Sequence, residues 1–596
     1  MALTTDSDHH QAVIRHVVDL AHRDQHLVTV ATTIPTSIAS RARVRLAAWT
    51  PGSYLLRYYV HHVQSINATD SSGRDVEVAP DGLTAWRLGE CTSSDTVTIN
   101  FEIYANDLSV RTSHVDDHHA LIIPAATFID IGGHSQLAHE VAFTGLRDHD
   151  QVHSLLPSLK DVFRADDYLH LVDSAFEVGD FPVVDFEILS VPHRFVWSAH
   201  GPTPDLDRIA RDASAIGKAA TALFDDELPI DRYTYLCTGW DQGGGGLEHR
   251  DGSVLQIPVQ MLDDEASLPR FQSLMAHEYF HVWNVKRLTP AALVSPDLES
   301  AVHTESLWVA EGWTSYYDKL LPSRAQVWQP RHLIGQLSDM FQRVLDTPGV
   351  ALQDLRTASH QAWTKHYVRD ENSPNAGTDY YSHGGVVAWE TDLRLRAARP
   401  DGDGLDDVLR LMWRRHSGHA EGYTEDDVLA AVAEVGGDSV AEHLERRITR
   451  PEPPAIDNSR LAVLGLRWEE STATDIPDLG VIVTEDDQSV VLASVLRDRP
   501  AWRAGVTGGD RLVAIDGWTV GRTALTRALR RYAAGDQVEL TVTRGPRLLT
   551  LPVVLDPPLP QHKLVPVDSA STAQQDQFSR WCGWSFDQVT KIVPET

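Results

Sequence analysis

The sequence predicts a multidomain α+β protein with a β-rich N-terminal part, a mainly helical middle and a small mixed C-terminal part. A chain of 596 residues is long enough for about three to five domains. Runs rich in Val, Ile, Thr and aromatic residues, such as "TVTINFEIYAND", fill 25–128 and are typical of an antiparallel β domain. Across 205–444, apolar residues recur every three or four positions, as in "RIARDASAIGKAATALFDD", which indicates amphipathic helices.

The C-terminal part begins after a proline-rich stretch. "TRPEPPAIDNS" (449–459) has three prolines among polar neighbours, which predicts a linker. Beyond the small mixed domain, the polar "DSASTAQQDQ" is expected to be flexible, whereas the aromatic "FSRWCGWSF" is expected to dock on another part of the chain. The predicted boundaries are 1–180 for the β-rich domain, 181–455 for the helical domain, 460–558 for the small domain and 559–596 for a tail.

The composition excludes several functional classes. The net charge of −32 argues against binding to nucleic acid or to anionic membranes. Three scattered cysteines, Cys91, Cys237 and Cys582, make neither a disulfide framework nor a Cys-rich zinc site. The first 26 residues lack the apolar region of a secretory signal, and no apolar run reaches 18 residues. We therefore expect a soluble, cytoplasmic protein with no membrane partner.

The stretch "MAHEYFHVWNVKRLTP" contains a possible metal site. Ser267 and Pro269 suit the start of a helix that leads into it. On that helix His277 and His281 leave the same face one turn apart, which is the spacing two imidazoles need to hold one Zn²⁺. Glu278 stands to the side, where it can accept a proton from the attacking water without being a ligand. Because the chain has 29 histidines, a helix with two surface histidines is the alternative.

A catalytic zinc needs a third protein ligand and an open fourth position. Glu311 lies in the apolar segment "LWVAEGWTSYYDK", where an ionised carboxylate is costly unless it is paired or bound to a metal. It is the best third ligand, and a partly exposed Glu of an amphipathic helix is the alternative.

Three further stretches have possible functional roles. In "DQGGGGLEHRDG", the run Gly243–Gly246 lets the backbone approach a ligand closely, although a flexible hairpin tip would look the same. In "DYYSHGGVVAWE", the hydroxyl of Tyr380 or Tyr381 could donate to an oxyanion, although paired tyrosines often only pack. "SHVDDHH" (113–119) has the composition of a metal cluster, but we expect a solvated or structural role.

Together these motifs resemble the glycyl aminopeptidase family of zinc metallopeptidases, a branch of the HExxH-plus-Glu group, the gluzincins. The resemblance covers most of the chain and extends over four elements: "AWTPGSYLLRYYVHHV", "YANDLSVRTSHVDD", "HEYFHVWNVKRL" and "AEGWTSYY". It implies a thermolysin-like, mainly helical catalytic domain behind the β domain. Residue by residue, it implies that His277, His281 and Glu311 bind zinc, that Glu278 is the general base and proton shuttle, and that Tyr381 stabilises the oxyanion.

The resemblance also assigns substrate contacts. Gly244, Gly245 and Gly246 would line the cleft, and Glu248 would bind the free α-amine. This chain departs from the family at His249, where relatives commonly have Asn, and at His383, where they usually have Lys. The second departure leaves the choice between Tyr380 and Tyr381 open.

The C-terminal stretch "VLRDRPAWRAGVTGGDRLVAIDGWTV" resembles the PDZ core of bacterial proteases. The match is carried by Pro500, Ala501, Ala504, Gly505, Gly509, Asp510 and Gly517. The resemblance makes Val463, Leu464, Gly465 and Leu466 the loop that binds the C-terminal carboxylate of a peptide. The alternative is that this domain only packs against the catalytic domain.

The sequence thus predicts a zinc aminopeptidase, with Zn²⁺ as its cofactor and peptides as its substrates. The resemblance suggests small N-terminal residues such as Gly or Ala. One alternative is a zinc endopeptidase whose PDZ domain recruits chain ends. The other is an inactive peptidase-like PDZ scaffold.

Overall fold

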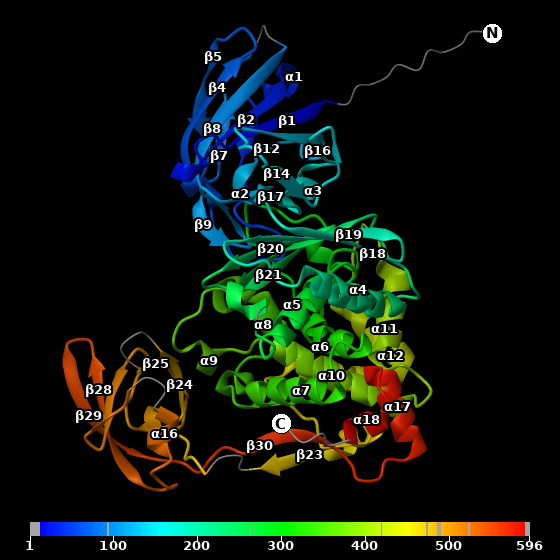
Figure 1. Ribbon diagram of the computed structural model, residues 1–596, viewed down its shortest axis with the longest axis vertical. Coiled ribbons are helices and arrows are strands. Elements are labelled where there is room, and N and C mark those ends of the chain that lie inside the picture. Colours follow the sequence, from blue (N-terminus) through cyan, green and yellow to red (C-terminus); the bar gives the residue numbers. More distant parts are fainter. Residues whose placement is uncertain are drawn as a thin grey trace. The chain divides into compact units, whose positions relative to one another are not determined.

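The structure is a computed structural model that describes residues 12–91, 95–262, 264–418, 420–471, 475–485, 490–521 and 525–590. The chain divides into two compact units, Met1–Val302 and His303–Thr596 (Figure 1). In the described residues no helix combines the length and the hydropathy that a membrane span requires.

An eight-stranded sheet dominates the N-terminal part of the first unit. Its order is β15 (Ser158–Leu159), β16 (Val162–Ala165), β13 (Ala138–Thr144), β1 (Val13–Asp19), β2 (Leu27–Pro35), β8 (Thr96–Tyr104), β4 (Val63–Asp70) and β5 (Asp75–Val76). Neighbouring strands are antiparallel except β1 and β13, which are parallel. Every second residue of β2 and β8 is buried, so these strands place one face in the core. The predicted antiparallel β domain is therefore confirmed, with one parallel pair.

Two smaller sheets and short helices complete this part. One sheet has the order β14 (Gln151–Ser154), β17 (Phe176–Gly179), β11 (Ala120–Ile122), β10 (Thr112–Val115) and β9 (Asn106–Ser109). The other has the order β12 (Asp130–Ile131), β3 (Arg43–Arg45), β7 (Ala85–Leu88) and β6 (Val78–Pro80). The short helices are η1 (Arg23–Gln25), α1 (Thr36–Ala39), η2 (Tyr59–His62), α2 (Pro124–Thr127) and α3 (Tyr168–Val172).

A five-stranded mixed sheet follows. Its strands between residues 233 and 258 lie within 205–444, where the sequence pattern predicted helices. Its order is β18 (Val183–Ile188), β19 (Val191–Ala199), β20 (Tyr233–Trp240), β22 (Gly252–Pro258) and β21 (Gly245–His249). β20 pairs in parallel with β19 and β22, whereas β21 forms the antiparallel edge. β20 and β22 are buried along almost their whole length, so they lack the alternation that would have indicated strands. Helices α4 (Leu206–Ala222) and α5 (Leu268–Phe280) pack on this sheet.

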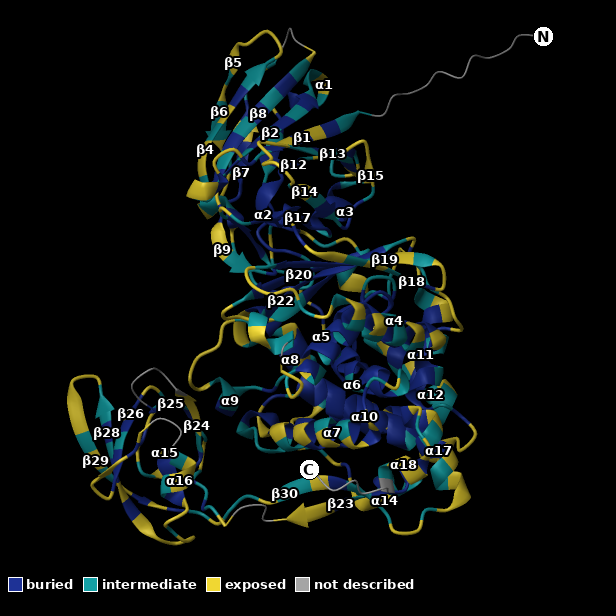
Figure 2. Ribbon diagram, in the orientation of Figure 1, coloured by how far each residue is buried: buried dark blue, intermediate teal, exposed yellow. Residues whose placement is uncertain are grey.

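Helices make up most of the second unit. They are η5 (Trp308–Trp313), α6 (Thr314–Arg324), α7 (Pro330–Leu345), η6 (Pro348–Ala351), α8 (Leu355–His360), η7 (Ala362–His366), α9 (Ser373–Ala376), α10 (Ser382–Ala398), α11 (Leu405–His416), α12 (Glu425–Gly436), α13 (Asp438–Thr449), α14 (Asn458–Leu461) and η8 (Ala462–Leu464). α10 is buried over most of its length and contacts α6, α7, α11, α12 and α13 (Figure 2). It is the central helix of this unit.

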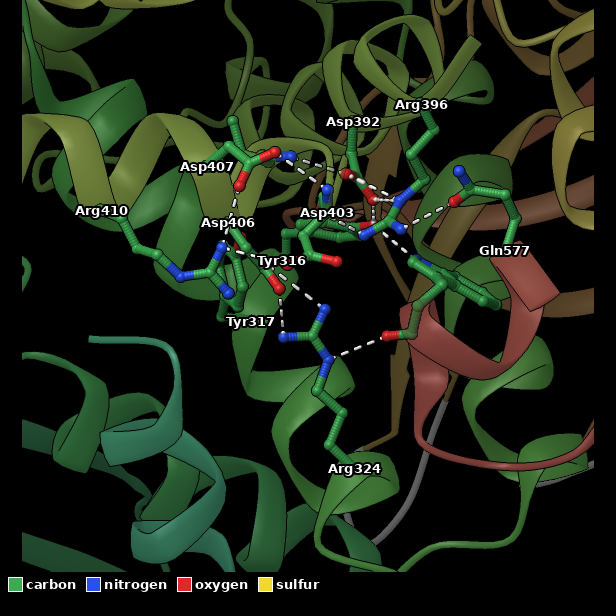
Figure 3. Close-up of polar contacts among 12 residues, drawn as sticks. Tyr316, Tyr317, Arg324, Asp392, Arg396, Asp403, Asp406, Asp407, Arg410 and Gln577 are labelled. Atoms are coloured by element: carbon green, nitrogen blue, oxygen red, sulfur yellow. Dashed lines mark hydrogen bonds and ion pairs between the residues drawn. The ribbon is translucent and has the colours of Figure 1, made fainter. Parts of the chain in front are cut away.

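The end of the chain is anchored to these helices through α17 (Thr572–Cys582) and α18 (Phe586–Thr590). The indole of Trp581 donates to the hydroxyl of Tyr316 at 2.8 Å, and that hydroxyl donates to Asp392 at 2.7 Å. Around them lies a buried network of acids and arginines in which Arg324 binds Asp406 at 2.9 Å (Figure 3). The docking of "FSRWCGWSF" is thus confirmed.

The expectation of a flexible "DSASTAQQDQ" is wrong. Ser571 and Gln574 form a capping box, in which each side chain bonds the backbone of the other residue, so this polar stretch begins α17. A polar composition suits an exposed first helical turn as well as a disordered tail, and the cap decides between them.

The predicted PDZ region forms its own sheet with the order β24 (Val481–Glu485), β25 (Val490–Val495), β26 (Arg511–Ile515), β28 (Gln537–Arg544) and β29 (Arg547–Val554); β27 (Trp518–Thr519) pairs with β26. Its core includes Leu492, Leu512 and Leu540, and its helices are α15 (Pro500–Arg503) and α16 (Leu525–Leu529).

Val463, Leu464, Gly465 and Leu466 do not belong to that sheet. They run from η8 into β23 (Leu466–Ser471), which pairs only with β30 (Gln561–Pro566) among the described strands. The ring of Trp468 in β23 lies against the rings of Phe341 in α7 and Trp389 in α10. The assignment of these four residues to the PDZ carboxylate loop is therefore wrong: a Gly between apolar residues here ends a 3-10 turn, with Gly465 at φ +66°.

The PDZ sheet contacts the loop that contains α9. The amide of Asn375 donates to the carbonyl of Val495 at 2.8 Å and accepts from the backbone N–H of Arg497 at 2.7 Å. The side chain of Glu371 lies against Gly508. This domain therefore packs on the helical part of the chain.

Candidate active site

His277 and His281 lie at the C-terminal end of α5. The helix begins at Leu268, with Pro269 in its first turn, but the Ser267 hydroxyl donates to Asp264 and does not cap the helix. His281 follows the last helical residue and keeps right-handed helical torsions, so the four-residue spacing still places both rings on one face. The ring centroids are 4.8 Å apart at an interplanar angle of 83°.

A main-chain contact fixes the orientation of His281. Its Nδ1 lies 2.6 Å from the carbonyl oxygen of Asn284, which can only accept a hydrogen bond. Nδ1 therefore carries the proton and Nε2 carries the lone pair that a metal requires. Nothing in the sequence indicates this contact, because its acceptor is a backbone atom in the turn after α5.

The carboxylate of Glu278 lies against the edge strand β21. Glu278 is buried, and the hydroxyl of Tyr233 donates to its backbone carbonyl at 3.2 Å. A Cβ at Gly246 would lie 2.1 Å from Glu278 Oε1, so only glycine leaves the carboxylate its place. Gly245 has φ +124°, which glycine adopts without strain. Gly244 has neither constraint, because its nearest contact would be 4.0 Å away.

The different surroundings of Gly246 and Gly244 yield a prediction. Gly246→Ala should lower kcat by at least about 10-fold, since a displaced Glu278 can no longer exchange protons in the right geometry. Gly244→Ala is the matched control and should leave kcat within about 2-fold, as ordinary surface substitutions do. Steady-state kinetics of both variants checks this. Equal losses in the two variants would contradict the contact between Gly246 and Glu278.

Glu248 is buried in β21, two residues after Gly246. Donor atoms of Glu248, Glu278 and His281 all lie within 4.8 Å of one another. The ammonium of Lys286 is 4.0 Å from Glu248 and 2.8 Å from Asp173. Burial lowers the pKa of Lys286, but the two carboxylates outweigh burial and raise it, so the amine is charged. Two carboxylates around one ammonium leave a net negative charge that suits a cationic ligand.

The "TPGSY" element of the N-terminal part reaches the same carboxylate. Gly52 has φ +87°, and a Cβ there would lie 2.6 Å from Glu248 Oε1. The backbone around Gly52 therefore forms one wall beside Glu248. Sequence reasoning recognised this element only as a family signature and did not place it at the site.

Glu311 lies in η5, a π-helical turn, and is only 2% exposed. Such turns are frequent at functional sites because they widen the spacing of side chains. Gly312 of η5 packs directly on α10: a Cβ there would be 2.6 Å from the Cα of Gly384. The close approach of these two glycines holds η5 against the N-terminal end of α10, where the two tyrosines lie.

Tyr380 and Tyr381 differ in exposure. Their rings stack at 4.9 Å, but Tyr380 is completely buried, whereas Tyr381 is only partly buried and immediately precedes α10. His366 lies near both rings, and burial lowers its pKa. A partly exposed tyrosine is better suited to meet a substrate than a fully buried one.

The two histidines that depart from the family are both buried. Nδ1 of His383 lies 2.9 Å from the Thr378 hydroxyl, and burial, followed by the charge of Arg447, lowers the pKa of His383 to about 3. It is therefore neutral, unlike the lysine usual in relatives. His249 lies 3.4 Å from Asp173 and thus belongs to the surroundings of Glu248.

Comparison with known proteins supports this reading of the motifs. The family model of the peptidase M61 N-terminal domain matches residues 15–180, that of the M61 glycyl aminopeptidases matches 270–387, and that of PDZ domains matches 477–555. No curated protein matches the sequence.

A crystal structure of an aminopeptidase N family protein from Idiomarina loihiensis is 27% identical to this chain. The alignment covers 96% of this chain and 100% of that one, with a TM-score of 0.89. A mutant M1 zinc metallopeptidase from Deinococcus radiodurans is 11% identical over 75% of this chain and 96% of that one, with a TM-score of 0.46. The second similarity is too weak to bear on this chain.

The family matches agree with the motifs in identity and in order along the chain. The predicted family, the fold class and the PDZ domain are therefore confirmed. The chain is a metallopeptidase that consists of an M61 N-terminal domain, a catalytic domain of the M61 glycyl aminopeptidase type and a PDZ domain.

Proposed function

We propose that this chain is a zinc-dependent aminopeptidase that removes N-terminal residues, small ones such as Gly or Ala among them, from peptides. The observation that carries the proposal is the arrangement of α5 and β21, which places Glu278 and His281 beside an acid, Glu248, in negatively charged surroundings. An aminopeptidase needs this combination, because it must bind a protonated α-amine next to the hydrolytic centre.

Zinc would be held by His277, His281 and Glu311. Two imidazole nitrogens and one carboxylate oxygen are a donor set that can hold a metal ion, and zinc accepts it readily. The proton on Nδ1 of His281 leaves Nε2 in the form that a metal needs. Bound there, zinc would supply a Lewis acid for the scissile carbonyl and the attacking water.

Three side chains would carry out proton transfer, oxyanion stabilisation and amine binding. Glu278 accepts a proton from the attacking water and later donates it to the leaving amine. Tyr381 donates a hydrogen bond to the oxyanion that develops on the carbonyl. Glu248 binds the α-ammonium group and so sets the first peptide bond as the one that is cut.

A panel of aminoacyl anilides tests the proposal. Wild-type protein should hydrolyse free-amine anilides, small residues best, and should lose this activity in a chelator and regain it with added zinc. Absence of hydrolysis across the panel, or hydrolysis that the chelator does not affect, would contradict the proposal.

The oxyanion role of Tyr381 gives a second prediction. Tyr381→Phe should lower kcat by about 10²-fold with unchanged zinc content, because it removes one hydrogen-bond donor to the oxyanion. Tyr380→Phe is the control, with a fully buried hydroxyl, and should retain most of kcat. If the two effects were reversed, the assignment would move to Tyr380.

Glu248 gives a third prediction. Glu248→Ala should raise KM for free-amine substrates by about 10- to 100-fold, the worth of a charge-assisted hydrogen bond of about 1.5–3 kcal/mol. The weak cleavage of N-acetylated substrates should remain unchanged, since these have no ammonium group. An equal effect on both substrates would argue against amine binding by Glu248.

The PDZ domain is proposed as a second binding module for peptide ends. β24 pairs on one side only within the described residues, so a peptide strand can be added at its other edge. A cavity of about 770 Å³ lies between residues 364–383 and β24–β25. Binding of C-terminal peptides to the full chain, abolished by amidation of the peptide, would support this module.

A further inference from the structure

A second cluster of metal-ligating side chains surrounds the turn between β10 and β11 in the first unit. His114 lies on β10, Asp116 and His119 lie in the turn, and Glu177 lies on the neighbouring strand β17. His114, His119 and Glu177 are 5%, 1% and 1% exposed. The peptidase chemistry described above uses none of them.

Glu177 fixes the orientation and tautomer of His119. Its Oε1 lies 2.8 Å from His119 Nδ1, which therefore carries the proton. The other ring nitrogen, Nε2, lies 2.8 Å from Nδ1 of His114. A carboxylate that orients a histidine through Nδ1 and leaves Nε2 for a cation is the usual second-layer arrangement of protein metal sites.

Asp116 supplies an oxygen to the same place. One of its oxygens accepts the backbone N–H groups of His118 and His119, at 2.7 and 2.9 Å, which orients the carboxylate. One donor atom from each of His114, Asp116 and His119 falls within 4.8 Å of the other two. This separation is close enough for three ligands of one ion.

The charges around the cluster are unbalanced without a cation. Glu177 Oε1 also accepts from the Ser198 hydroxyl at 3.1 Å, but Oε2 has no hydrogen-bond partner among the described residues. The guanidinium of Arg23 is already paired with Asp150 at 2.8 Å. One proton shared by the two imidazoles would balance one of the carboxylates Asp116 and Glu177, whereas a divalent cation balances both.

We propose that His114, Asp116 and His119 bind a structural divalent metal ion, zinc by the chemistry of the ligands, with Glu177 as a positioning residue for His119. Two imidazoles and a carboxylate favour zinc over the hard cations, which prefer oxygen ligands alone. The near-complete burial of both histidines suits a structural site better than a catalytic one, which must stay open to substrate.

Such an ion would join two sheets. The β10–β11 turn and β17 belong to the five-stranded sheet of the N-terminal part, whereas Ser198 lies on β19 of the following sheet and bonds to Glu177. The ring of Trp240, at the end of β20, lies 5.8 Å from that of His114. The expected effect of the metal is therefore on stability and not on turnover.

The test uses full-length protein in which His277→Ala and His281→Ala remove the proposed catalytic ligands. After loading with ZnCl₂ and dialysis, elemental analysis should find about one zinc per chain in this background. Adding His114→Ala should bring the content close to zero, and adding Glu177→Gln should weaken zinc binding by about 10- to 100-fold. His118→Ala, in the same turn but outside the ligand set, is the control and should keep the zinc.

Thermal unfolding provides a second measurement. Zinc should raise Tm of the background and of its His118→Ala variant, but not of its His114→Ala variant. A background without zinc, or a His114→Ala variant with as much zinc as its parent, would show that the cluster holds only a proton. If His114→Ala fails to fold, the nearly isosteric Glu177→Gln decides, and unchanged zinc affinity in that variant overturns the proposal. Failure of the proposed function would instead leave the wild-type zinc content unaltered by His277→Ala and His281→Ala.

Discussion

Glu278→Gln should lose about 10²- to 10⁴-fold in kcat while it retains the zinc content of the wild type. The amide keeps the volume of the carboxylate but cannot accept a proton from the attacking water. Gly246 packs within van der Waals distance of this side chain, and Gln fits the same space, so the fold should not change. Steady-state kinetics and elemental analysis of the same preparation provide the two readouts.

The metal content of this variant also decides between two ligand sets. Donor atoms of Glu248, Glu278 and His281 are close enough to hold an ion by themselves. If Glu278→Gln loses zinc, Glu278 is a ligand and this alternative set is right. If it keeps both zinc and near-normal kcat, Glu278 is not the base.

His281→Ala should have the largest effect, because His281 belongs to both possible ligand sets. Zinc content should fall by about one equivalent per chain, and hydrolysis of aminoacyl anilides should fall to the background rate. His61→Ala, which changes an exposed histidine of the same unit, is the control and should retain both. A His281→Ala variant with full zinc and full activity would rule out α5 as the metal-binding helix.

Glu311→Gln extends this comparison to the third ligand. An amide oxygen is a weaker ligand for zinc than a carboxylate, so zinc should dissociate at lower chelator concentrations than from the wild type. Glu248→Ala should not change that concentration if Glu248 binds only the substrate amine.

The sequence predicted those features of the site that depend on local spacing. The four-residue spacing of His277 and His281 is enough to place two rings on one helical face, and in the structure the ring centroids are 4.8 Å apart. The glycine run before Glu248 was also found, because four consecutive glycines are conspicuous in any chain. Local patterns of this kind do not depend on the tertiary fold.

Features that depend on tertiary contacts were missed. The Asn284 carbonyl that orients His281 is a backbone atom, and Gly52 reaches Glu248 from nearly 200 positions away in the sequence. The "VLGL" stretch was misassigned for the opposite reason. Its four residues fit a short motif, but only the pairing of β23 with β30 shows where they lie.

The cluster of His114, Asp116 and His119 also depends on tertiary contacts that the sequence does not reveal. The composition of "SHVDDHH" is that of a metal cluster, but the stretch lies in the β-region that resembles the family, which favours a solvated or structural role. Nothing in the sequence links it to position 177. Glu177 is brought beside His119 by the pairing of β11 with β17. A structural metal site is therefore an inference that only the fold makes available.

The central claim, that this metallopeptidase trims chains from their free N-terminus, is tested most directly by two peptides of the same sequence, one with a free α-amine and one N-acetylated. Mass spectrometry of timed digests should show stepwise loss of N-terminal residues from the free peptide, abolished by a chelator, and an intact acetylated peptide. Internal cleavage of both peptides at similar rates would contradict the account and favour an endopeptidase.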